Sequence, residues 1–412
     1  MINQYAITPD LPGGTRHYDF GCELVKAGYL VRIFASDVNL ALRRHTKLQD
    51  GQLWREDVVN GVRFVWVRAA TYQVNDWRRV WNMLTFTFNV VRVGLYFKHA
   101  GARPRSIIGS SPHPFAALSA WALAKAHRAR FILELRDLWP QALVDMGGLS
   151  ERSPVVKGMR LLERFLYRVA EKIIILAPGS ERYLVQKGVS KEKLVYIPNG
   201  VHLGNFQGIP QVMNDLRGDM EVDRARGSAT PAAFTVMYTG AHGPANSLET
   251  VLEAARLLED RRDIRLILVG DGPSKRELIQ KAKALRLTNV QFMDPVPKNQ
   301  IPNLLASADA TLITLRAAEA FSYAVSPNKL FDYMAAGRPV LCAVPGDMAR
   351  LVEESGAGVA VEPENPEALA RAVKRLADSP IEVREDMGRR GRAFVEAHYS
   401  REELARRLAE IL

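Results

Sequence analysis

The sequence has few cysteines and no hydrophobic run long enough to cross a membrane. Its 412 residues include only two cysteines, Cys22 and Cys342, which are far apart and show no metal-ligand spacing. A disulfide framework is therefore excluded, and a reducing cytoplasm is the expected compartment. No stretch resembles a signal peptide or contains 18 consecutive apolar residues, so we expect no membrane span.

Several short motifs that bind cofactors or carry out hydrolysis are also missing. The sequence has no GxGxxG dinucleotide fingerprint, no GxxxxGK[ST] phosphate loop and no GxSxG nucleophile elbow. It has no D-x-D for a nucleotide-bound metal, and Glu221–Asp223 is a poor substitute. We therefore expect neither a metal site nor a bound cofactor.

Acidic residues are scarce in the first half of the chain. Residues 1–200 contain 29 Lys and Arg against 16 Asp and Glu, whereas the remaining residues contain 27 against 29. The net charge of +11 therefore originates in the first half. A one-sided basic domain suggests an anionic membrane surface, a phosphate-bearing substrate or nucleic acid as partner. Because the arginines are scattered and no nucleic-acid motif is present, we favour the first two.

The most hydrophobic segment, Met83–Phe97, is interrupted by Asn89 and Arg92 and is too short and polar to span a bilayer. It continues a helical pattern that begins near Trp77. One apolar stripe of this pattern contains Trp77, Trp81, Leu84, Phe88, Val91 and Leu95, and a second apolar side contains Phe86, Val93 and Phe97. Two interpretations are open: a helix packed on a sheet, or partial insertion at a membrane surface with Trp77–Trp81 at the level of the headgroups.

Apolar runs that are typical of buried strands alternate with helical patterns along the whole chain. Six runs fall in the first half (30–36, 62–69, 106–111, 130–137, 171–178 and 193–200) and six in the second (234–240, 264–270, 290–296, 310–315, 338–344 and 357–363). Such runs, separated by helices, predict parallel βαβ units, so we expect an α/β fold with two doubly wound domains. The expected domains are residues 1–206 and 234–390, with an irregular linker at 207–233. A last helical pattern runs from about Ile381 to Leu412, and one option for residues 391–412 is a return to the first domain.

The first strand of the first domain is expected to be very short. A strand should precede the opening loop and helix, yet only "MINQYA" is left for it. Either the true start lies a few residues earlier or the strand is truncated. In both cases we expect a weakened sheet.

Loops that follow the strands contain glycine where a phosphate could approach the backbone. Gly13 and Gly14 precede the first helical pattern, and Gly240 follows the first strand of the second half. Ligands bind at the carboxyl ends of parallel strands, and helix N-termini favour anions. The Gly13–Gly14 loop is equally well explained as a plain turn into a helix.

Charged and polar side chains follow two neighbouring strands of the first half. His113 follows one strand, and Glu134, Arg136 and Asp137 end the next. His113 could donate to a sugar hydroxyl or a phosphate, or it could be an ordinary loop residue. The three charged residues could face a substrate, or they could form a structural ion pair beside Trp139.

The stretch Ser326–Val340 has complete helix start and stop signals. Ser326 is a good N-cap, Pro327 suits the first helical position, and Gly337 and Pro339 end the helix. Its polar arc consists of Asn328, Lys329, Asp332 and Ala336. The arc is explained either by a surface helix with a Lys329–Asp332 pair or by an anionic ligand at the positive helix N-terminus.

Taken in order, these motifs resemble glycosyltransferase family 4, whose retaining enzymes have the GT-B fold of two Rossmann-like domains facing across a cleft. The resemblance covers essentially the whole chain apart from the linker. It is carried by "PGGTRHYDFGCELVKAGYLVRIFAS", "YTGAHGPANSLETVLEAARLL", "LILVGDGPSKRELIQKAKAL", "VQFMDPVPKNQIPNLLASADATLI" and "SPNKLFDYMAAGRPVL". The stretches "LELRDLWPQALVDMG" and "SPNKLFDYMAAGRPV" further resemble bacterial O-antigen and capsule transferases of the N-acetyl-L-fucosaminyltransferase type.

The resemblance implies roles for individual residues. Asp332 stands where a carboxylate, more often Glu, bonds the ribose, and Ala324 stands where a second glutamate contacts the donor sugar. Ala241 and His242 replace the Arg and Lys that often bind the diphosphate, so Lys329 is expected to take over that role. The implied donor-binding residues are Gly13, Gly14, Gly240, Val296, Ser326, Asn328, Lys329 and Asp332; the implied catalytic residues are His113, Lys329 and Asp137, with Glu134 and Arg136 on the acceptor side.

The implied activity is transfer of a sugar, with retention, from a UDP-linked or other nucleoside diphosphate donor to a lipid-linked or polysaccharide acceptor. No side chain qualifies as a covalent nucleophile, which favours a front-face displacement with Lys329 stabilising the leaving diphosphate. The expected partners are the nucleotide-sugar, the lipid-linked glycan and an anionic inner-membrane surface, without nucleic acid. Two alternatives stay open: a nucleotide-sugar epimerase of the same fold, and a non-catalytic nucleotide-sugar-binding or membrane scaffold protein.

Overall fold

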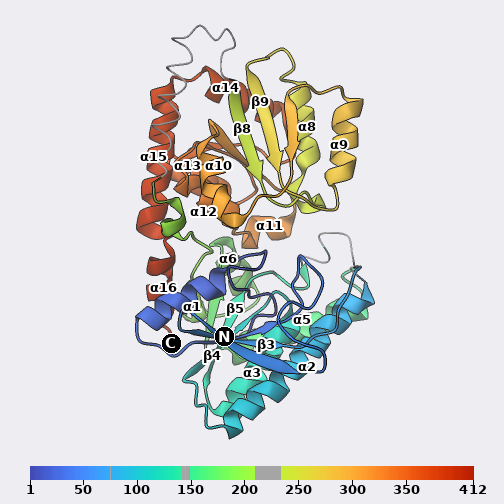
Figure 1. Cartoon of the computed structure of the whole chain (residues 1–412), viewed down its shortest axis with the longest axis vertical. Coiled ribbons are helices and arrows are strands. Elements are labelled where there is room, and N and C mark those ends of the chain that lie inside the picture. The colour runs from blue at the N-terminus through green and yellow to red at the C-terminus, as the bar shows by residue number, and fades with distance from the viewer. Residues whose placement is uncertain (75, 142–143, 145–148, 209–232) are drawn as a thin grey trace. The chain divides into compact units, whose positions relative to one another are not determined.

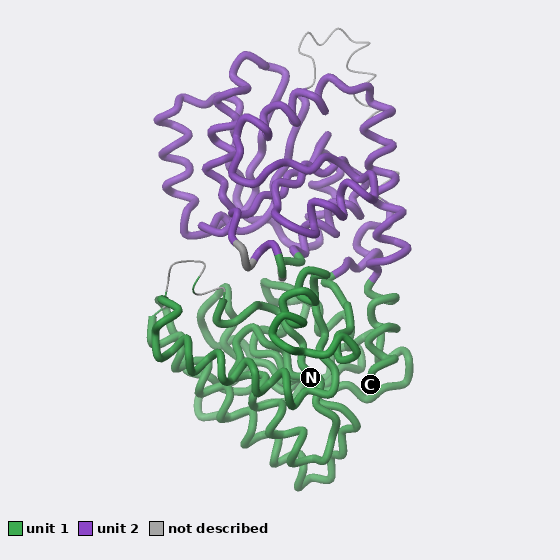
Figure 2. Tube along the Cα trace, turned by 180° about the vertical axis from the view of Figure 1, so that it is seen from behind, with its two compact units in different colours: residues 1–199, 323–326, 401–412 green, residues 200–322, 327–400 purple. Residues whose placement is uncertain are grey.

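The computed structural model describes residues 1–412 except 75, 142–143, 145–148 and 209–232. The described residues form two compact units, each built around its own sheet, which is mostly parallel in unit 1 and parallel in unit 2 (Figures 1 and 2). Unit 1 consists of Met1–Asn199, Tyr323–Ser326 and Arg401–Leu412, and unit 2 consists of Gly200–Ser322 and Pro327–Ser400. Most of the linker expected at 207–233, including Glu221–Asp223, lies outside the described residues.

The named strands of unit 1 form two pieces of one sheet. They are β1 (Arg32–Ser36), β2 (Trp54–Val59), β3 (Val62–Val67), β4 (Ser106–Ser110), β5 (Arg130–Leu135), β6 (Lys172–Ile175) and β7 (Leu194–Tyr196). One piece has the order β2-β3-β1 and the other β4-β5-β6-β7, and only the β2–β3 pairing is antiparallel among these named strands. The six strands predicted for this half are confirmed. The additional strand β2 has the charged sequence WREDVV and no buried residue, so no hydrophobic pattern predicts it.

Residues Met1–Gln4 join the two pieces. Ile2 pairs in parallel with β1 on one side and with β4 on the other. Its amide donates to the Ile108 carbonyl at 2.8 Å, and its carbonyl accepts from the Ser110 amide at 2.9 Å. The first strand is short, as expected, but hydrogen bonds on both sides and the burial of Ile2 make it the centre of the sheet rather than a weak edge.

Helices cover both faces of this sheet. They are α1 (Arg16–Lys26), α2 (Trp77–His99), α3 (Pro114–His127), α5 (Pro154–Val169), α6 (Gly179–Gln186) and α16 (Arg401–Ala409). Successive strand residues point to opposite faces. Ile173 belongs to a core shared with α2, α3 and α5, whereas Ile174 belongs to a core shared with α1 and α16. Unit 1 is therefore doubly wound.

Unit 2 contains a six-stranded parallel sheet. Its strands are β8 (Phe234–Thr239), β9 (Ile264–Val269), β10 (Val290–Met293), β11 (Ala310–Thr314), β12 (Val340–Ala343) and β13 (Gly358–Ala360). All six are predicted from the sequence, and their spatial order is β10-β9-β8-β11-β12-β13. The chain winds outward from β8 to β10 and then continues on the other side from β11. The carboxyl ends of β8 and β11 therefore form the topological switch point, where open α/β sheets bind ligands.

The helices associated with unit 2 are α8 (Leu248–Arg256), α9 (Lys275–Ala284), α10 (Ile301–Ala306), α11 (Glu319–Ala324), α12 (Asn328–Ala335), α13 (Asp347–Glu354), α14 (Pro366–Asp378) and α15 (Ile381–His398). The last residues of α11 belong to the short piece Tyr323–Ser326 of unit 1. The single final helix expected from about Ile381 is corrected to two helices, because α15 ends at His398 and α16 begins at Arg401. Residues 401–412 belong to unit 1.

Candidate functional site

The first turn of α12 lies beside the end of β8, at the switch point of unit 2. Lys329 Nζ donates to Tyr238 Oη at 2.8 Å and to Asn246 Oδ1 at 3.1 Å. Nζ also lies 4.2 Å from the centre of the Tyr238 ring. Tyr238 Oη donates to the Ala241 carbonyl at 2.7 Å, which leaves its oxygen as an acceptor for Lys329.

Lys329 has no carboxylate partner among the residues that the structure describes. An ammonium has three N–H donors, and the two neutral acceptors use only two of them. Burial lowers the pKa of this half-buried lysine to about 7, and a nearby anion would favour its charged form. The third donor and the charge can therefore be used by an anionic ligand.

Tyr333 attaches α12 to β8. Its hydroxyl accepts from the Thr239 amide at 2.8 Å and donates to the Thr239 carbonyl at 3.1 Å. Tyr333 is fully buried, and Leu330 and Phe331 are buried in the same helix. Because these contacts fix the helix against the strand, Lys329 is positioned before a ligand arrives, as electrostatic stabilisation of developing charge requires.

The loop after β8 brings bare backbone to the same place. Gly240 has a φ of +145°, and a Cβ atom there would lie 2.9 Å from Lys329 Nζ. Glycine is therefore favoured both by the backbone conformation and by the close approach of the lysine. His242, two residues later, is buried, and burial lowers its pKa to about 4. Its imidazole is therefore neutral at pH 7, and the cations whose charge acts on it are Lys275 and Lys329.

The structure corrects the expected start of α12. Pro327 is extended, with ψ of 125°, and acts as an N-cap without a side-chain hydrogen bond, so the helix begins at Asn328. Ser326 Oγ accepts from the Asn199 amide at 3.4 Å, and the Ser326 carbonyl accepts from Asn199 Nδ2. Ser326 is an acceptor in both of these hydrogen bonds, and its role toward a donor stays a prediction. Asn328 is exposed and Asp332 half-buried, as the polar arc predicts, and their roles toward a donor stay predictions.

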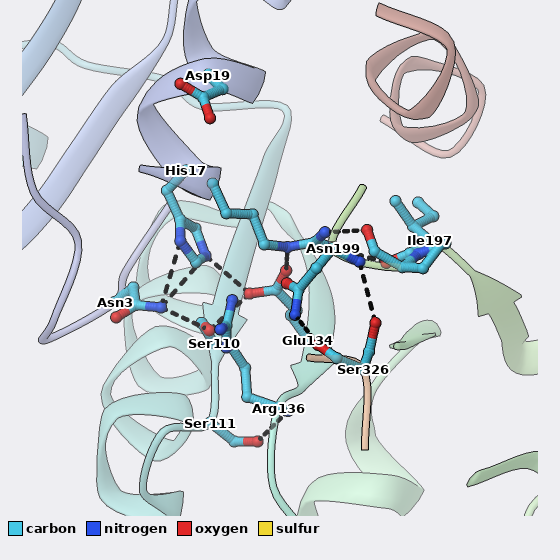
Figure 3. Close-up of polar contacts among 12 residues, drawn as sticks. Asn3, His17, Asp19, Ser110, Ser111, Glu134, Arg136, Ile197, Asn199 and Ser326 are labelled. Carbon is cyan, nitrogen blue, oxygen red and sulfur yellow. Dashed lines mark hydrogen bonds and ion pairs between the residues drawn. The ribbon is translucent and has the colours of Figure 1, made fainter. Parts of the chain in front are cut away.

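A second polar cluster lies in unit 1 around Glu134, in β5 (Figure 3). Glu134 Oε1 accepts from Arg16 Nε at 2.8 Å, and Oε2 lies 2.7 Å from His17 Nε2. Oε2 also accepts from Ser110 Oγ at 2.6 Å. Arg16 donates in addition to the Ile197 carbonyl at 2.7 Å. The cluster therefore connects α1, β4, β5 and the residue that follows β7.

The pKa shifts in this cluster follow from burial and pairing. Burial would raise the pKa of Glu134, but the charges of His17 and Arg16 and their hydrogen bonds hold it well below its usual value. Burial lowers the pKa of His17 despite the neighbouring carboxylate, and lowers the pKa of Arg16 to about 10. Glu134 is only 3% exposed, and both its oxygens bind protein groups. These contacts favour the alternative of a structural ion pair, and the acceptor-side role of Glu134 stays a prediction.

His113 is the N-cap of α3 rather than a free donor. Its Nδ1 accepts from the Ala116 amide at 3.3 Å, so Nε2 carries the proton and donates to Gln4 Oε1. The imidazole is fully buried, and burial lowers its pKa to about 3. Since both ring nitrogens bind protein groups, these contacts favour the alternative of a structural loop residue, and the role in positioning a donor sugar stays a prediction.

Replacing His113 with alanine is expected to lower the free energy of unfolding of unit 1 by about 1–2 kcal/mol, because the helix loses its cap. The His113→Asn variant should recover part of this loss, because asparagine caps helices well. Urea titrations followed by tryptophan fluorescence measure both variants. An asparagine variant with wild-type stability but no sugar transfer would instead favour the positioning role.

Five other predicted residues lie in loops. Arg136 is half-buried and Asp137 exposed, directly after β5. Gly13 and Gly14 are exposed immediately before α1, and Val296 is half-buried after β10. The structure places these five residues in loops at the ends of strands, as the sequence predicts. Their roles toward a substrate stay predictions.

Sequence reasoning missed the partners of both clusters. Tyr238 and Asn246 hold Lys329, while Arg16 and His17 hold Glu134. The Arg-His pair directly after the glycine loop is a visible signal. Its carboxylate lies 118 positions away from Arg16, however, and no local pattern connects the two.

The described residues contain neither a metal-ligand cluster nor a helix that could span a membrane. No group of three or more His, Cys, Asp and Glu side chains there is arranged to hold a metal ion. No helix within that part of the chain combines the length and the apolar character needed to pass through a membrane.

Both halves of the chain match known families. Residues 13–200 match the glycosyl transferase 4-like domain, and residues 219–394 match glycosyl transferases group 1. A protein of Escherichia coli K12 named as the colanic acid biosynthesis glycosyl transferase WcaI is 27% identical over 334 residues, which cover 78% of each chain. A protein of Pseudomonas aeruginosa named as the glycosyltransferase WbjE is 22% identical over 302 residues, covering 73% of this chain and 72% of the relative.

Solved structures share the fold. Sucrose-phosphate synthase from Thermosynechococcus elongatus has a TM-score of 0.73 at 19% identity, covering 100% of this chain and 96% of that one. Anabaena HepE, solved with UDP, has a TM-score of 0.69 at 17% identity, covering 100% and 98%. WaaG, a glycosyltransferase of lipopolysaccharide biosynthesis, has a TM-score of 0.66 at 16% identity, again covering 100% and 98%. The predicted α/β GT-B fold is confirmed, and with its 4-like domain and its group 1 domain the chain is a GT-B glycosyltransferase.

Proposed function

We propose that the protein transfers a sugar, with retention of configuration, from a UDP-linked donor to a lipid-linked or polysaccharide acceptor in the synthesis of a bacterial surface glycan. The observation that carries the proposal is Lys329, a positioned cation without a carboxylate partner in the described residues, beside Gly240 at the switch point. The UDP and UDP-glucose bound in the HepE structures support this choice of ligand. The relatives named for colanic acid and lipopolysaccharide synthesis support the class of product.

In this reaction the bond between the anomeric carbon and the leaving phosphate oxygen breaks, while the acceptor oxygen bonds to the same face of that carbon. The proton of the acceptor hydroxyl passes to the departing phosphate oxygen. Negative charge grows on the diphosphate, and Lys329 with the amides at the start of α12 stabilises it. We propose that this cationic stabilisation replaces a metal ion, so that transfer continues in the presence of a chelator.

Unit 1 is proposed to bind the acceptor, which is held at the inner face of the cell membrane. Its excess of basic residues is compatible with an anionic lipid surface. The stretches "LELRDLWPQALVDMG" and "SPNKLFDYMAAGRPV" favour an N-acetylated amino sugar as the transferred group.

The direct test is incubation of the purified protein and bacterial membranes with a panel of radiolabelled nucleotide-sugars. We expect label to enter lipid-extractable or polysaccharide material from one UDP-linked N-acetylated amino sugar, with and without EDTA. Chromatography of the remaining donor, in parallel samples without membranes, detects an epimerase. Conversion of the donor without an acceptor, or binding of UDP without any turnover, would replace the transferase proposal by one of the two alternatives.

A further inference from the structure

Helix α2 of unit 1 is apolar on two opposite sides, and only one of them is covered. The inner side packs into the core of unit 1 through Met83, Phe86, Val90, Val93 and Phe97. The outer face, which we define as Trp77, Val80, Trp81, Leu84 and Phe88, spans about 100° of arc at the helical period. Trp77 is 69% exposed, Trp81 55% and Phe88 65%, so the outer face lies open along most of the helix.

The charges of α2 have one sign. Residues 77–99 contain four Lys and Arg and no Asp or Glu. The Arg78 guanidinium lies 5.7 Å from the Trp77 ring centre, and the Arg92 guanidinium lies 5.7 Å from the Phe88 ring centre. Both cations therefore border the apolar face, which is the distribution of amphipathic helices that lie in the interface of an anionic bilayer.

We infer that the outer face of α2 is a membrane-docking surface, which places this helix in the headgroup region of an anionic lipid bilayer. A second copy of the same face is a poor partner, because Arg78 and Arg92 would meet arginines. The carboxylate of Asp76, the N-cap of α2, already lies 3.9 Å from Arg78 of the same chain. A bilayer containing acidic lipids covers the apolar side chains and neutralises the arginines together. Docking through an amphipathic helix does not require a helix that crosses the membrane.

The same helix reaches the strand ends of unit 1 from its inner side. Asn82 Oδ1, in the second turn of α2, accepts from Nε2 of Gln4, at the end of the first strand, at 2.6 Å. The membrane-docking surface therefore begins next to the loop that follows the first strand. The following consequence, and no other part of the inference, depends on the proposed function. If that function is correct, a lipid-linked acceptor reaches unit 1 while its lipid stays in the bilayer.

The experiment uses the full chain and vesicles of phosphatidylcholine with or without phosphatidylglycerol. We expect the wild type to sediment with the phosphatidylglycerol vesicles, with a blue shift of tryptophan emission. The Trp81→Ser/Phe88→Ser variant should bind at least about tenfold more weakly, because it removes two of the apolar side chains that insert. The Arg78→Gln/Arg92→Gln variant should lose roughly fivefold per charge, and only on the anionic vesicles.

The matched control is Leu30→Ser/Val58→Ser, which removes two exposed apolar side chains from other parts of unit 1 (97% and 65% exposed) and should bind vesicles normally. Equal vesicle binding by the wild type and the Trp81→Ser/Phe88→Ser variant would overturn the inference. The absence of vesicle binding by the wild type would also overturn it. So would a wild-type dimer, detected by light scattering, that dissociates only in the Trp81→Ser/Phe88→Ser variant. UDP affinity, measured on the same samples, reports on the proposed function separately, because α2 belongs to unit 1 and Lys329 to unit 2.

Discussion

Methionine in place of Lys329 is expected to weaken UDP binding roughly 10- to 100-fold, the effect of losing a hydrogen bond to a charged group. It should also lower kcat for sugar transfer by about 10²–10³, because the charge on the leaving diphosphate is greatest in the transition state. Methionine keeps the length and most of the packing of the lysine side chain. Isothermal titration with UDP and initial rates of transfer measure the two effects.

The affinity of UDP should also depend on pH through Lys329. Burial lowers its pKa to about 7, so above that pH the free protein contains an increasingly neutral amine, whereas the complex needs the ammonium. Binding then takes up a proton, and the dissociation constant should rise by up to about tenfold per pH unit between pH 7 and 9. Phosphate groups, with a second pKa near ~6, and His242, whose pKa is about 4, are already deprotonated in this range.

The matched control for both measurements is Lys374→Met, which removes a lysine of unit 2 that pairs with Asp260 on the surface. It should leave the UDP affinity and its pH dependence unchanged. A Lys329→Met protein that is folded and binds UDP as tightly as the wild type would return Lys329 to the role of a surface residue. If the dissociation constant of UDP does not change with pH in the wild type, proton uptake by Lys329 is contradicted, but its role in binding UDP is not.

Glutamine in place of Glu134 is expected to reduce the free energy of unfolding of unit 1 by about 3–5 kcal/mol, the typical cost of removing one partner of a buried ion pair. The substitution leaves the Arg16 charge in the protein interior, where its other acceptors, within the part of the chain that the structure describes, are the carbonyls of Ile197 and Pro198. The side chains of Arg16 and Glu134 are 3% and 4% exposed, so water cannot compensate. Urea unfolding followed by tryptophan fluorescence measures the loss.

The exposed pair Arg130–Glu171 of the same unit provides the control. Its side chains are 32% and 49% exposed, and Glu171→Gln should cost less than about 1 kcal/mol. If Glu134→Gln unfolds at the same urea concentration as Glu171→Gln but abolishes transfer, the acceptor-side role of Glu134 is favoured instead.

Most of the fold follows from hydrophobic patterns. Twelve strands are predicted correctly because a strand buried on both faces leaves a continuous apolar run, as in "RFILEL" and "IRLILV". The edge strand β2, which has no fully buried residue, leaves no such run. The stripe containing Trp77 and Phe88 shows the limit of periodicity, because two apolar sides of α2 are visible in the sequence but the covered side is decided by tertiary packing.

The site is less predictable than the fold. Strand ends predict where His113 and Glu134 lie, because the carboxyl ends of parallel strands share one edge. The start signals of a helix predict where Lys329 lies. Whether such a residue faces a ligand depends on partners that are distant in the sequence. Gln4 accepts from a ring nitrogen of His113, and Arg16 donates to Glu134. Tyr238 and Asn246 together leave one N–H donor of Lys329 available.

The division of the chain has a consequence for its synthesis. Unit 1 includes the last twelve residues, and α16 packs on α1 through the core that contains Leu404 and Leu408. Ser106 and Arg130 also donate to the carbonyl of Leu412. On the ribosome, unit 1 is therefore the first unit to emerge and the last to be completed. One side of α1 stays uncovered until unit 2 has been synthesised and α16 follows. A nascent chain arrested before residue 401 is the form most in need of a chaperone.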